Sequence, residues 1–256
     1  MRKLTNSTGH LLQLSVENTI RRNPSSADWQ IVTHEFPWQD SLSLESGFAD
    51  LILRSSCYLA IRAVIECKRV RDGDWVFLQS DRAEEHISQS CCCWAERANA
   101  DPSTRWKDTR IHPVSWRSEF CIIRGSGDKG EPYLERVSRR LLAATEAIAM
   151  TEIGFENPDS TEALLIYLPI IVTNANLSIA QFSLNDIDPE TGALPRSKGK
   201  FESVPFVRFH KNLCTDMNDV GAAGTLSQVA KRLERTVFVV NAARLLEFFG
   251  HFDIRE

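Results

Sequence analysis

Short apolar runs separated by turn residues dominate the first part of the chain. The runs GFADLIL (47–53) and YLAIRAVIECKRV (58–70) are rich in aliphatic and β-branched residues, which favours strands. Only the residues Arg54-Ser55-Ser56-Cys57 separate them, and so short a connection predicts an antiparallel hairpin. Similar runs predict further strands at 29–36, 75–78, 119–125, 163–174, 176–184, 204–212 and 236–241.

Apolar residues at helical spacing mark a second kind of segment. The clearest covers residues 133–154, with a predicted buried stripe of Leu134, Val137, Leu141, Ala144 and Ile148. Its arginines, Arg136, Arg139 and Arg140, lie mostly off that stripe. Weaker patterns predict helices at 5–22, 81–98 and 226–234 and in AARLLEFFGHF (242–252), and a loop at 99–116.

The order of these segments predicts the fold class. An antiparallel hairpin is followed by strand, helix and strand, which is typical of an α/β (α+β) domain. We expect one domain over residues 1–256, with an insertion at about 80–130, after the strand that ends near residue 70. A division into two domains near 185–200 is the alternative.

Composition and charge leave an ordinary soluble globular protein as the simplest interpretation. Of the 256 residues 43% are hydrophobic and 25% are charged, and the net charge of −4 gives no overall basic field. The N-terminus lacks a signal-peptide pattern, and the longest apolar run (163–172) is short and broken by Pro169. We therefore expect a cytoplasmic protein without membrane association.

The cysteines point away from a disulfide scaffold. The chain has seven, and Cys91, Cys92 and Cys93 are consecutive. A zinc site formed by His86, Cys91 and Cys93 is one alternative, although no Cys-x2-Cys pair exists in the chain. We favour reduced thiols on a helix that directs one or two of them into the core.

Charged residues in the predicted hairpin are the strongest functional signal. Because side chains alternate along a strand, Glu66 and Lys68 share one face and Cys67 takes the other. A hairpin centred near residue 58 would place Asp50 opposite Glu66. The turn signal at Ser55-Ser56 comes early for that centre, so this register requires a bulge or a wider loop.

Two facing carboxylates beside a lysine suit one particular chemistry. Buried carboxylates repel each other unless a cation lies between them, and Mg²⁺ or Mn²⁺ accepts such hard oxygen ligands. We predict Asp50 and Glu66 as metal ligands, with Lys68 orienting or deprotonating the attacking water or stabilising charge on a phosphate. The arrangement suits phosphodiester hydrolysis.

The residues Asp50 in GFADLIL and Glu66-Cys67-Lys68 in AVIECKRV resemble the motif of the PD-(D/E)XK nuclease superfamily, the restriction-endonuclease-like fold. Ala49 stands where the superfamily's name places proline, and the resemblance covers roughly residues 1 to 80. It implies a mixed central β-sheet flanked by helices, divalent-metal dependence, and a supporting catalytic role for the helical Glu17. It also implies an endonuclease acting on nucleic acid, DNA rather than RNA, in prokaryotic defence, as a homodimer or within a larger defence complex.

Further residues and two rival functions complete the hypothesis. Weaker candidates for nucleic-acid contact are Gln79, Arg136, Arg139, Arg140 and Lys211, although a solvated helix face explains the arginines equally well. One rival is a non-catalytic member of the same fold that binds nucleic acid or serves in assembly. The other is an unrelated α/β binding domain in which Glu66 and Lys68 form a salt bridge at a strand end.

Overall fold

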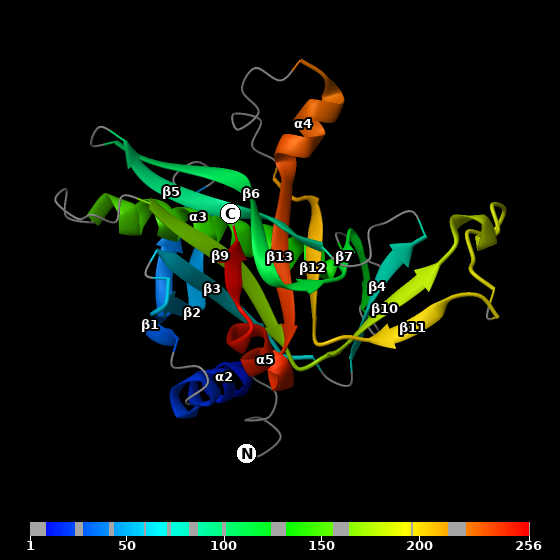
Figure 1. The fold of residues 1–256 in the computed structure, drawn as a ribbon, viewed down its shortest axis with the longest axis horizontal. Coiled ribbons are helices and arrows are strands. Elements are labelled where there is room, and N and C mark those ends of the chain that lie inside the picture. The colour runs from blue at the N-terminus through cyan, green and yellow to red at the C-terminus, as the bar shows by residue number, and fades with distance from the viewer. Residues whose placement is uncertain are drawn as a thin grey trace.

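The computed structural model of the chain describes residues 9–23, 28–40, 44–58, 60–70, 73–81, 87–98, 101–123, 132–155, 164–195, 197–214 and 224–255. Within these residues the fold is mixed α/β, with a mixed central sheet flanked by helices and a second, smaller sheet beside it (Figure 1). The predicted fold class is confirmed at this level.

The central sheet begins with an antiparallel meander and continues with parallel neighbours. Its main path runs in the order β1 (Trp29–Gln39), β2 (Ser46–Ser55), β3 (Ile61–Lys68), β9 (Leu164–Thr173), β13 (Glu234–Asn241), β12 (Phe206–Asn212) and β7 (Arg117–Ser118). Strand β2 is antiparallel to both of its neighbours, β1 and β3, whereas β9 is parallel to both β3 and β13. The β2–β3 hairpin confirms the antiparallel arrangement predicted from its short connection.

The expected insertion turns out to extend the central sheet. Strand β5 (Ile87–Ala98) pairs with the first half of β9 and with β6 (Asp101–Ser115), and β6 also pairs with β14 (Asp253–Arg255). The predicted helix at 81–98 and the predicted loop at 99–116 are therefore wrong where the structure describes them. Strand β5 is covered on both sides, with Cys92 in one core and Cys93 in the other. Burial on both faces removes the polar alternation by which a strand is recognised.

The second sheet contains β11 (Lys200–Ser203), β10 (Asn176–Phe182), β4 (Asp74–Ser80) and β8 (Phe120–Ile123) in that order. It projects to one side of the molecule, at the right of Figure 1. The chain enters it three times, from β3 into β4, from β7 into β8 and from β9 into β10. The strand predicted at 75–78 is thus confirmed, but it leaves the central sheet directly after the charged end of β3.

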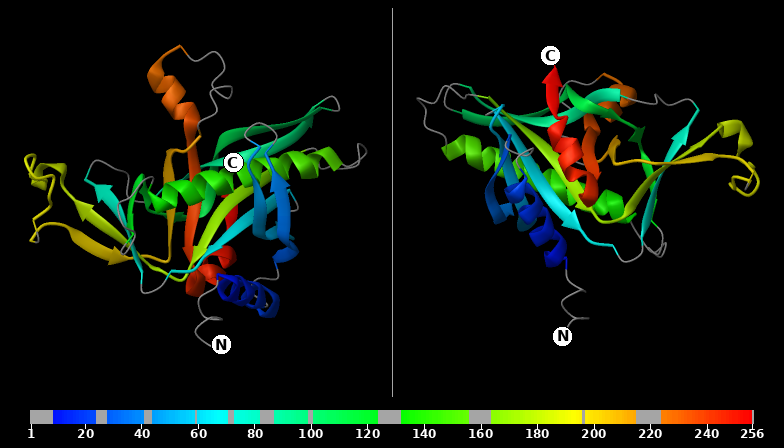
Figure 2. Two further views of the ribbon diagram at one scale, coloured as in Figure 1. Left: turned by 180° about the vertical axis from the view of Figure 1, so that it is seen from behind. Right: turned by 60° about the horizontal axis from the view of Figure 1, so that its bottom comes forward.

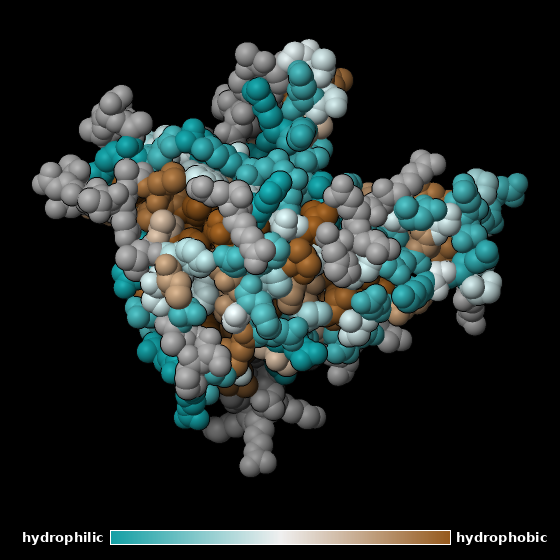
Figure 3. Space-filling view, viewed as in Figure 1, coloured by the Kyte–Doolittle hydropathy of each residue, from teal (hydrophilic) through white to brown (hydrophobic). Residues whose placement is uncertain are grey.

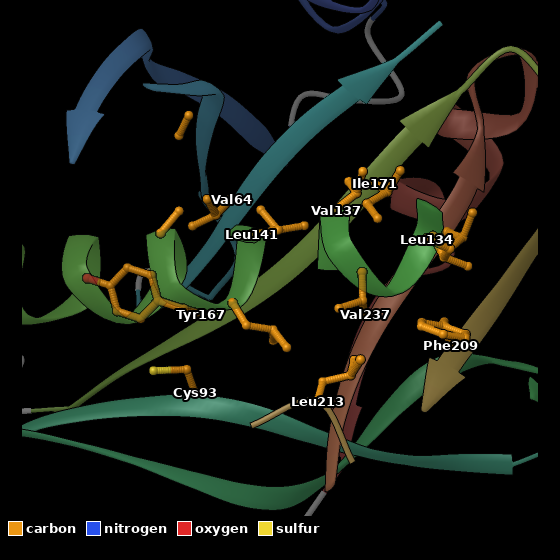
Figure 4. Close-up of a cluster of buried hydrophobic side chains, with 14 of the residues drawn as sticks. Val64, Cys93, Leu134, Val137, Leu141, Tyr167, Ile171, Phe209, Leu213 and Val237 are labelled. Atoms are coloured by element: carbon orange, nitrogen blue, oxygen red, sulfur yellow. The ribbon is translucent and has the colours of Figure 1, made fainter. Parts of the chain in front are cut away.

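Helices cover the two faces of the central sheet (Figure 2). Helix α3 (Tyr133–Phe155) packs on one face, where the predicted stripe from Leu134 to Ile148 is buried against residues such as Val64 and Ile171 (Figure 4). Helices α2 (His10–Arg22) and α5 (Leu245–Gly250) pack on the other face. Ala63, Val64 and Ile65 are all apolar because both faces of β3 are buried: Val64 lies in the core on one face, and Ala63 and Ile65 lie in the core on the other.

The remaining helical segments lie at the periphery. Helix α4 (Leu226–Leu233) projects from the body, and short 3-10 turns lie at η2 (Leu184–Asp186) and η4 (Ala242–Arg244). In the space-filling view, hydrophobic residues gather beneath a rim of polar ones (Figure 3). Among the described residues, no helix combines the length and the apolar character that crossing a membrane requires.

Candidate active site

The register of the β2–β3 hairpin places Asp50 next to Glu66 on the neighbouring strand. The pairing of β2 with β3 runs without a shift from Arg54 opposite Arg62 to Leu51 opposite Ile65, so Asp50 and Glu66 are the next residues beyond that ladder. Strand β2 ends at Ser55, whose hydroxyl accepts a hydrogen bond from the backbone N–H of Tyr58, and β3 begins at Ile61. The wider loop anticipated from the sequence is present, and no bulge interrupts this pair of strands.

Asp50 is held at the end of the ladder by one strong hydrogen bond. Its Oδ2 accepts the backbone N–H of Cys67 at 2.6 Å, while its own backbone carbonyl accepts Nε2 of Gln13 at 3.1 Å. Burial and then the nearby Glu66 carboxylate raise the pKa of Asp50 to about 6, although the Cys67 amide and the Lys68 ammonium act in the opposite direction. Ionisation of the Asp50 carboxyl group therefore costs more free energy in the folded protein than in the unfolded chain.

Glu66 and Lys68 form an ion pair on the α3 side of the sheet. The Nζ of Lys68 contacts Oε1 of Glu66, and both side chains are mostly buried. Burial alone would lower the pKa of Lys68, but the Glu66 carboxylate and its hydrogen bond outweigh that effect, so the pKa is raised. Lys68 consequently remains a cation at neutral pH, which suits charge stabilisation better than removal of a proton from water. Cys67 takes the opposite face, as predicted.

Glu35 is a third carboxylate at this place that the sequence did not reveal. It lies on β1 between the pairs His34–Leu51 and Phe36–Ala49, and therefore beside Asp50. Its charge contributes to raising the pKa of Asp50. The backbone of Glu35 has a φ of 50°, which is uncommon for a residue other than glycine. Three neighbouring strands thus each contribute an acid at this end of the sheet.

Glu17 has ion-pair partners of its own on α2 and β1. Its helix, α2, packs on the face that carries Ile65 and Cys67, opposite the face of Glu66 and Lys68. The Glu17 carboxylate is paired with Arg21 at 2.8 Å and lies 3.9 Å from Nδ1 of His34. A supporting role for Glu17 therefore stays a prediction from the resemblance alone.

The weaker candidates for nucleic-acid contact fall in different surroundings. Gln79 is buried on the second sheet, and Lys211 is paired with Glu135 at 2.9 Å. The arginines Arg136, Arg139 and Arg140 are exposed on α3. The Arg136 guanidinium lies 5.6 Å from the ring centroid of Tyr133, whose phenol interacts electrostatically with Lys68.

The carboxylates of Asp50 and Glu66 are the kind of ligand that a hard divalent cation takes, but they are few. Two carboxylates beside each other supply oxygen ligands of the kind that Mg²⁺ takes, and Mg²⁺ usually retains several waters. The described residues contain no group of three or more histidine, cysteine, aspartate or glutamate side chains arranged to hold a metal. A cation bound here would therefore have to complete its coordination with water, backbone or substrate oxygens.

The zinc alternative gains no support from the cysteines of β5. Burial raises the pKa of the Cys92 and Cys93 thiols well above its usual value, which disfavours the thiolate form that ligates zinc. His86, the other residue of that hypothesis, lies outside the described residues.

Comparisons with protein-family models, with curated proteins and with solved structures found no match for this chain.

Proposed function

We propose that the chain is a Mg²⁺- or Mn²⁺-dependent nuclease that hydrolyses phosphodiester bonds of DNA, with a restriction-endonuclease-like arrangement of its central sheet. The observation that supports it best is the meeting of Asp50 with the Glu66–Lys68 pair at the end of the β2–β3 ladder. There burial and the Glu66 charge raise the pKa of Asp50 to about 6. Electrostatic strain of this kind is characteristic of functional sites, and a divalent cation would relieve it.

In this proposal each residue has a separate task. Asp50 and Glu66 would hold the cation, which supplies polarisation of a phosphoryl oxygen and activation of a water. The Cys67 amide keeps the Asp50 carboxylate in place through its 2.6 Å hydrogen bond. Lys68 keeps its proton and offers positive charge to the phosphate as negative charge develops on its oxygens.

The order of elements supports the same proposal. Helix α2 precedes a meander β1–β2–β3 that carries the acids, and α3 precedes β9, which is parallel to β3. This order is the one that the resemblance to the PD-(D/E)XK superfamily implies. A role in prokaryotic defence rests on that resemblance alone.

A non-catalytic nucleic-acid-binding or assembly module with the same fold is the second candidate. It is favoured by the pairing of Glu66 with Lys68, which occupies one of the two carboxylates. It is also favoured by the lack of a third ligating side chain among the described residues.

The test compares the wild type with Asp50→Asn and Lys68→Ala on plasmid and single-stranded DNA, with Mg²⁺, with Mn²⁺ or with EDTA. Asparagine retains an acceptor for the Cys67 amide, and Glu247→Gln on α5 is the control for loss of one acid elsewhere. We expect cleavage that requires metal, is lost in both site variants and persists in Glu247→Gln.

A second measurement separates the two candidates if no cleavage occurs. Adding Mg²⁺ at ten times its dissociation constant is expected to stabilise the wild type by about 1.4 kcal/mol, and Asp50→Asn by much less. Metal binding that depends on Asp50 without cleavage would indicate that the DNA substrate requires a partner. Absence of both metal binding and cleavage would favour the non-catalytic module.

A further inference from the structure

The three exposed arginines of α3 lie in distinct environments, and two of them lie beside the candidate site. Arg136 packs over Tyr133, whose phenol interacts electrostatically with Lys68. Arg140, one helical turn further, reaches β2 at Gly47, three residues before Asp50. Arg136 and Arg140 therefore follow the edge of the site along one side of the helix.

Gly47 makes room for the Arg140 guanidinium. A Cβ at this position would lie 2.5 Å from Nη2 of Arg140 and 3.3 Å from Nε1 of Trp38, the cross-strand neighbour of Gly47. The backbone conformation does not demand glycine here, because the glycines with positive φ among the described residues are Gly192 and Gly199. Glycine weakens a strand and is often found where another group must approach closely, so the approach of Arg140 explains its presence.

No acidic group among the described residues pairs with Arg136 or Arg140. The acids of α3 are engaged elsewhere: Glu135 pairs with Lys211, Glu146 accepts a hydrogen bond from Thr104, and Glu152 pairs with Arg62. Two like charges four residues apart on a helix destabilise it by a few tenths of a kcal/mol. Arg136 and Arg140 thus form a pair of like charges without an acidic partner among the described residues, which leaves both guanidinium groups available to an anion.

We propose that Arg136 and Arg140 bind two phosphates of one nucleic-acid strand and lead it past Tyr133 to Asp50, Glu66 and Lys68. This inference rests on the proposed function, and it names the substrate as a polynucleotide that extends beyond the scissile bond, not a small phosphodiester. Side chains four residues apart on a helix have Cβ atoms about 6 Å apart, a separation that consecutive phosphates of one strand can bridge. Contacts of this kind position the strand without reading its bases.

The test measures binding of labelled single-stranded and duplex oligonucleotides in EDTA, where cleavage does not interfere. We expect Arg136→Ala and Arg140→Ala each to weaken binding roughly threefold to tenfold and to reduce the salt slope by about 1. Arg244→Ala in η4, directly before α5 on the other face of the sheet, removes the same charge and is expected to leave affinity nearly unchanged. An equal loss in Arg244→Ala, or no binding to either oligonucleotide, would overturn the proposal.

Gly47→Ala tests whether binding depends on the position of the Arg140 guanidinium against Gly47, and it leaves the net charge unchanged. It is expected to displace the guanidinium and weaken binding, by at most the loss seen in Arg140→Ala. Gly47→Ala combined with Arg140→Ala is expected to bind no more weakly than Arg140→Ala alone. Gly154→Ala on α3 is the matched control, since a Cβ there meets nothing within 4 Å. Equal thermal melting of the variants excludes misfolding as the cause. Unchanged binding by Gly47→Ala would contradict the assignment.

The two proposals fail separately. Arginine-dependent binding in EDTA, with neither cleavage nor Asp50-dependent metal binding by the wild type, would refute the nuclease and leave a strand-binding edge. Metal-dependent cleavage that requires Asp50, with binding indifferent to Arg136, Arg140 and Gly47, would support the nuclease and refute this inference.

Discussion

Asp50 and Arg208 are both charged residues set into the central sheet, and their surroundings are opposite. Arg208 on β12 is 0% exposed, yet its guanidinium donates to Ser90 Oγ at 2.8 Å, to Ser115 Oγ and to the carbonyls of Ile111 and Pro113. The Cζ of the Arg208 guanidinium lies 5.3 Å from the ring centroid of Phe238. Burial lowers its pKa to about 10, so it is still charged at neutral pH.

Asp50 has fewer partners and more adverse neighbours. Its carboxylate accepts one backbone N–H, and two other acids contribute to a pKa of about 6. A charge surrounded by hydrogen-bond partners of matching geometry serves the fold, because removing it leaves those partners unsatisfied. A charge that its surroundings oppose does not serve the fold, and this difference is the physical reason to assign function to Asp50 and structure to Arg208.

The largest expected effect comes from removing Arg208. Arg208→Met would leave two hydroxyls and two carbonyls of the β5–β6 region without their donor, and we expect a loss of about 3–5 kcal/mol in the free energy of unfolding. Urea denaturation followed by circular dichroism measures it. Arg54→Met, at an exposed position of β2, is the control and is expected to change stability by less than about 1 kcal/mol. A similar loss of stability in Arg208→Met and Arg54→Met would mean that Arg208 does not stabilise the fold through its hydrogen bonds.

Asp50→Asn is expected to act in the opposite direction. The asparagine keeps an acceptor for the Cys67 amide and removes the repulsion with Glu66, so the variant is expected to be more stable than the wild type by about 1–3 kcal/mol at pH 7.5 without divalent cations. Urea denaturation of both proteins in EDTA measures the difference. A variant less stable than the wild type would mean that the Asp50 charge stabilises the fold.

The pH dependence of that difference follows from the pKa of Asp50. The folded-state pKa of about 6 exceeds the unfolded value of 3.8, so between these values the folded protein holds the proton more tightly. This contribution to stability is present at low pH and is lost as the pH rises through the window from about 4 to 6. The stability advantage of Asp50→Asn is therefore expected to be small near pH 4 and full above pH 7. A difference that is constant from pH 4 to 7.5 would contradict the raised pKa.

Much of the fold could be predicted from the sequence where one face of an element meets water or where a turn is short. The buried stripe of α3 lies opposite a face that meets water, and the β2–β3 hairpin has a short turn. The register of that hairpin then determines that Asp50 lies next to Glu66. The β5–β6 hairpin was missed because Cys91, Cys92 and Cys93 are all buried, so no alternation distinguished a strand from a helix.

The site was predictable only in part for a related reason. Asp50 and Glu66 belong to one hairpin, whose local geometry sets their separation. Glu35 belongs to another strand pair, and its position depends on the register of β1, which the turn signals of residues 37–46 did not define. Glu17 shows the converse, because an apolar arc on a helix does not reveal which face of a sheet the helix will cover.

The smallest expected effects distinguish Glu35 from Glu17 as the third acid of the site. Glu35→Gln removes one of the charges that oppose ionisation of Asp50, so we expect the pKa of Asp50 to fall by a few tenths. Glu17→Gln breaks an i,i+4 ion pair with the exposed Arg21, which costs about 0.3–0.5 kcal/mol of stability and leaves the pKa of Asp50 unchanged. Carboxyl-carbon NMR titration of Asp50 measures both. A shift caused by Glu17→Gln and not by Glu35→Gln would move the third acid to α2, as the family resemblance implies, where Gln13 already donates a hydrogen bond to the backbone carbonyl of Asp50.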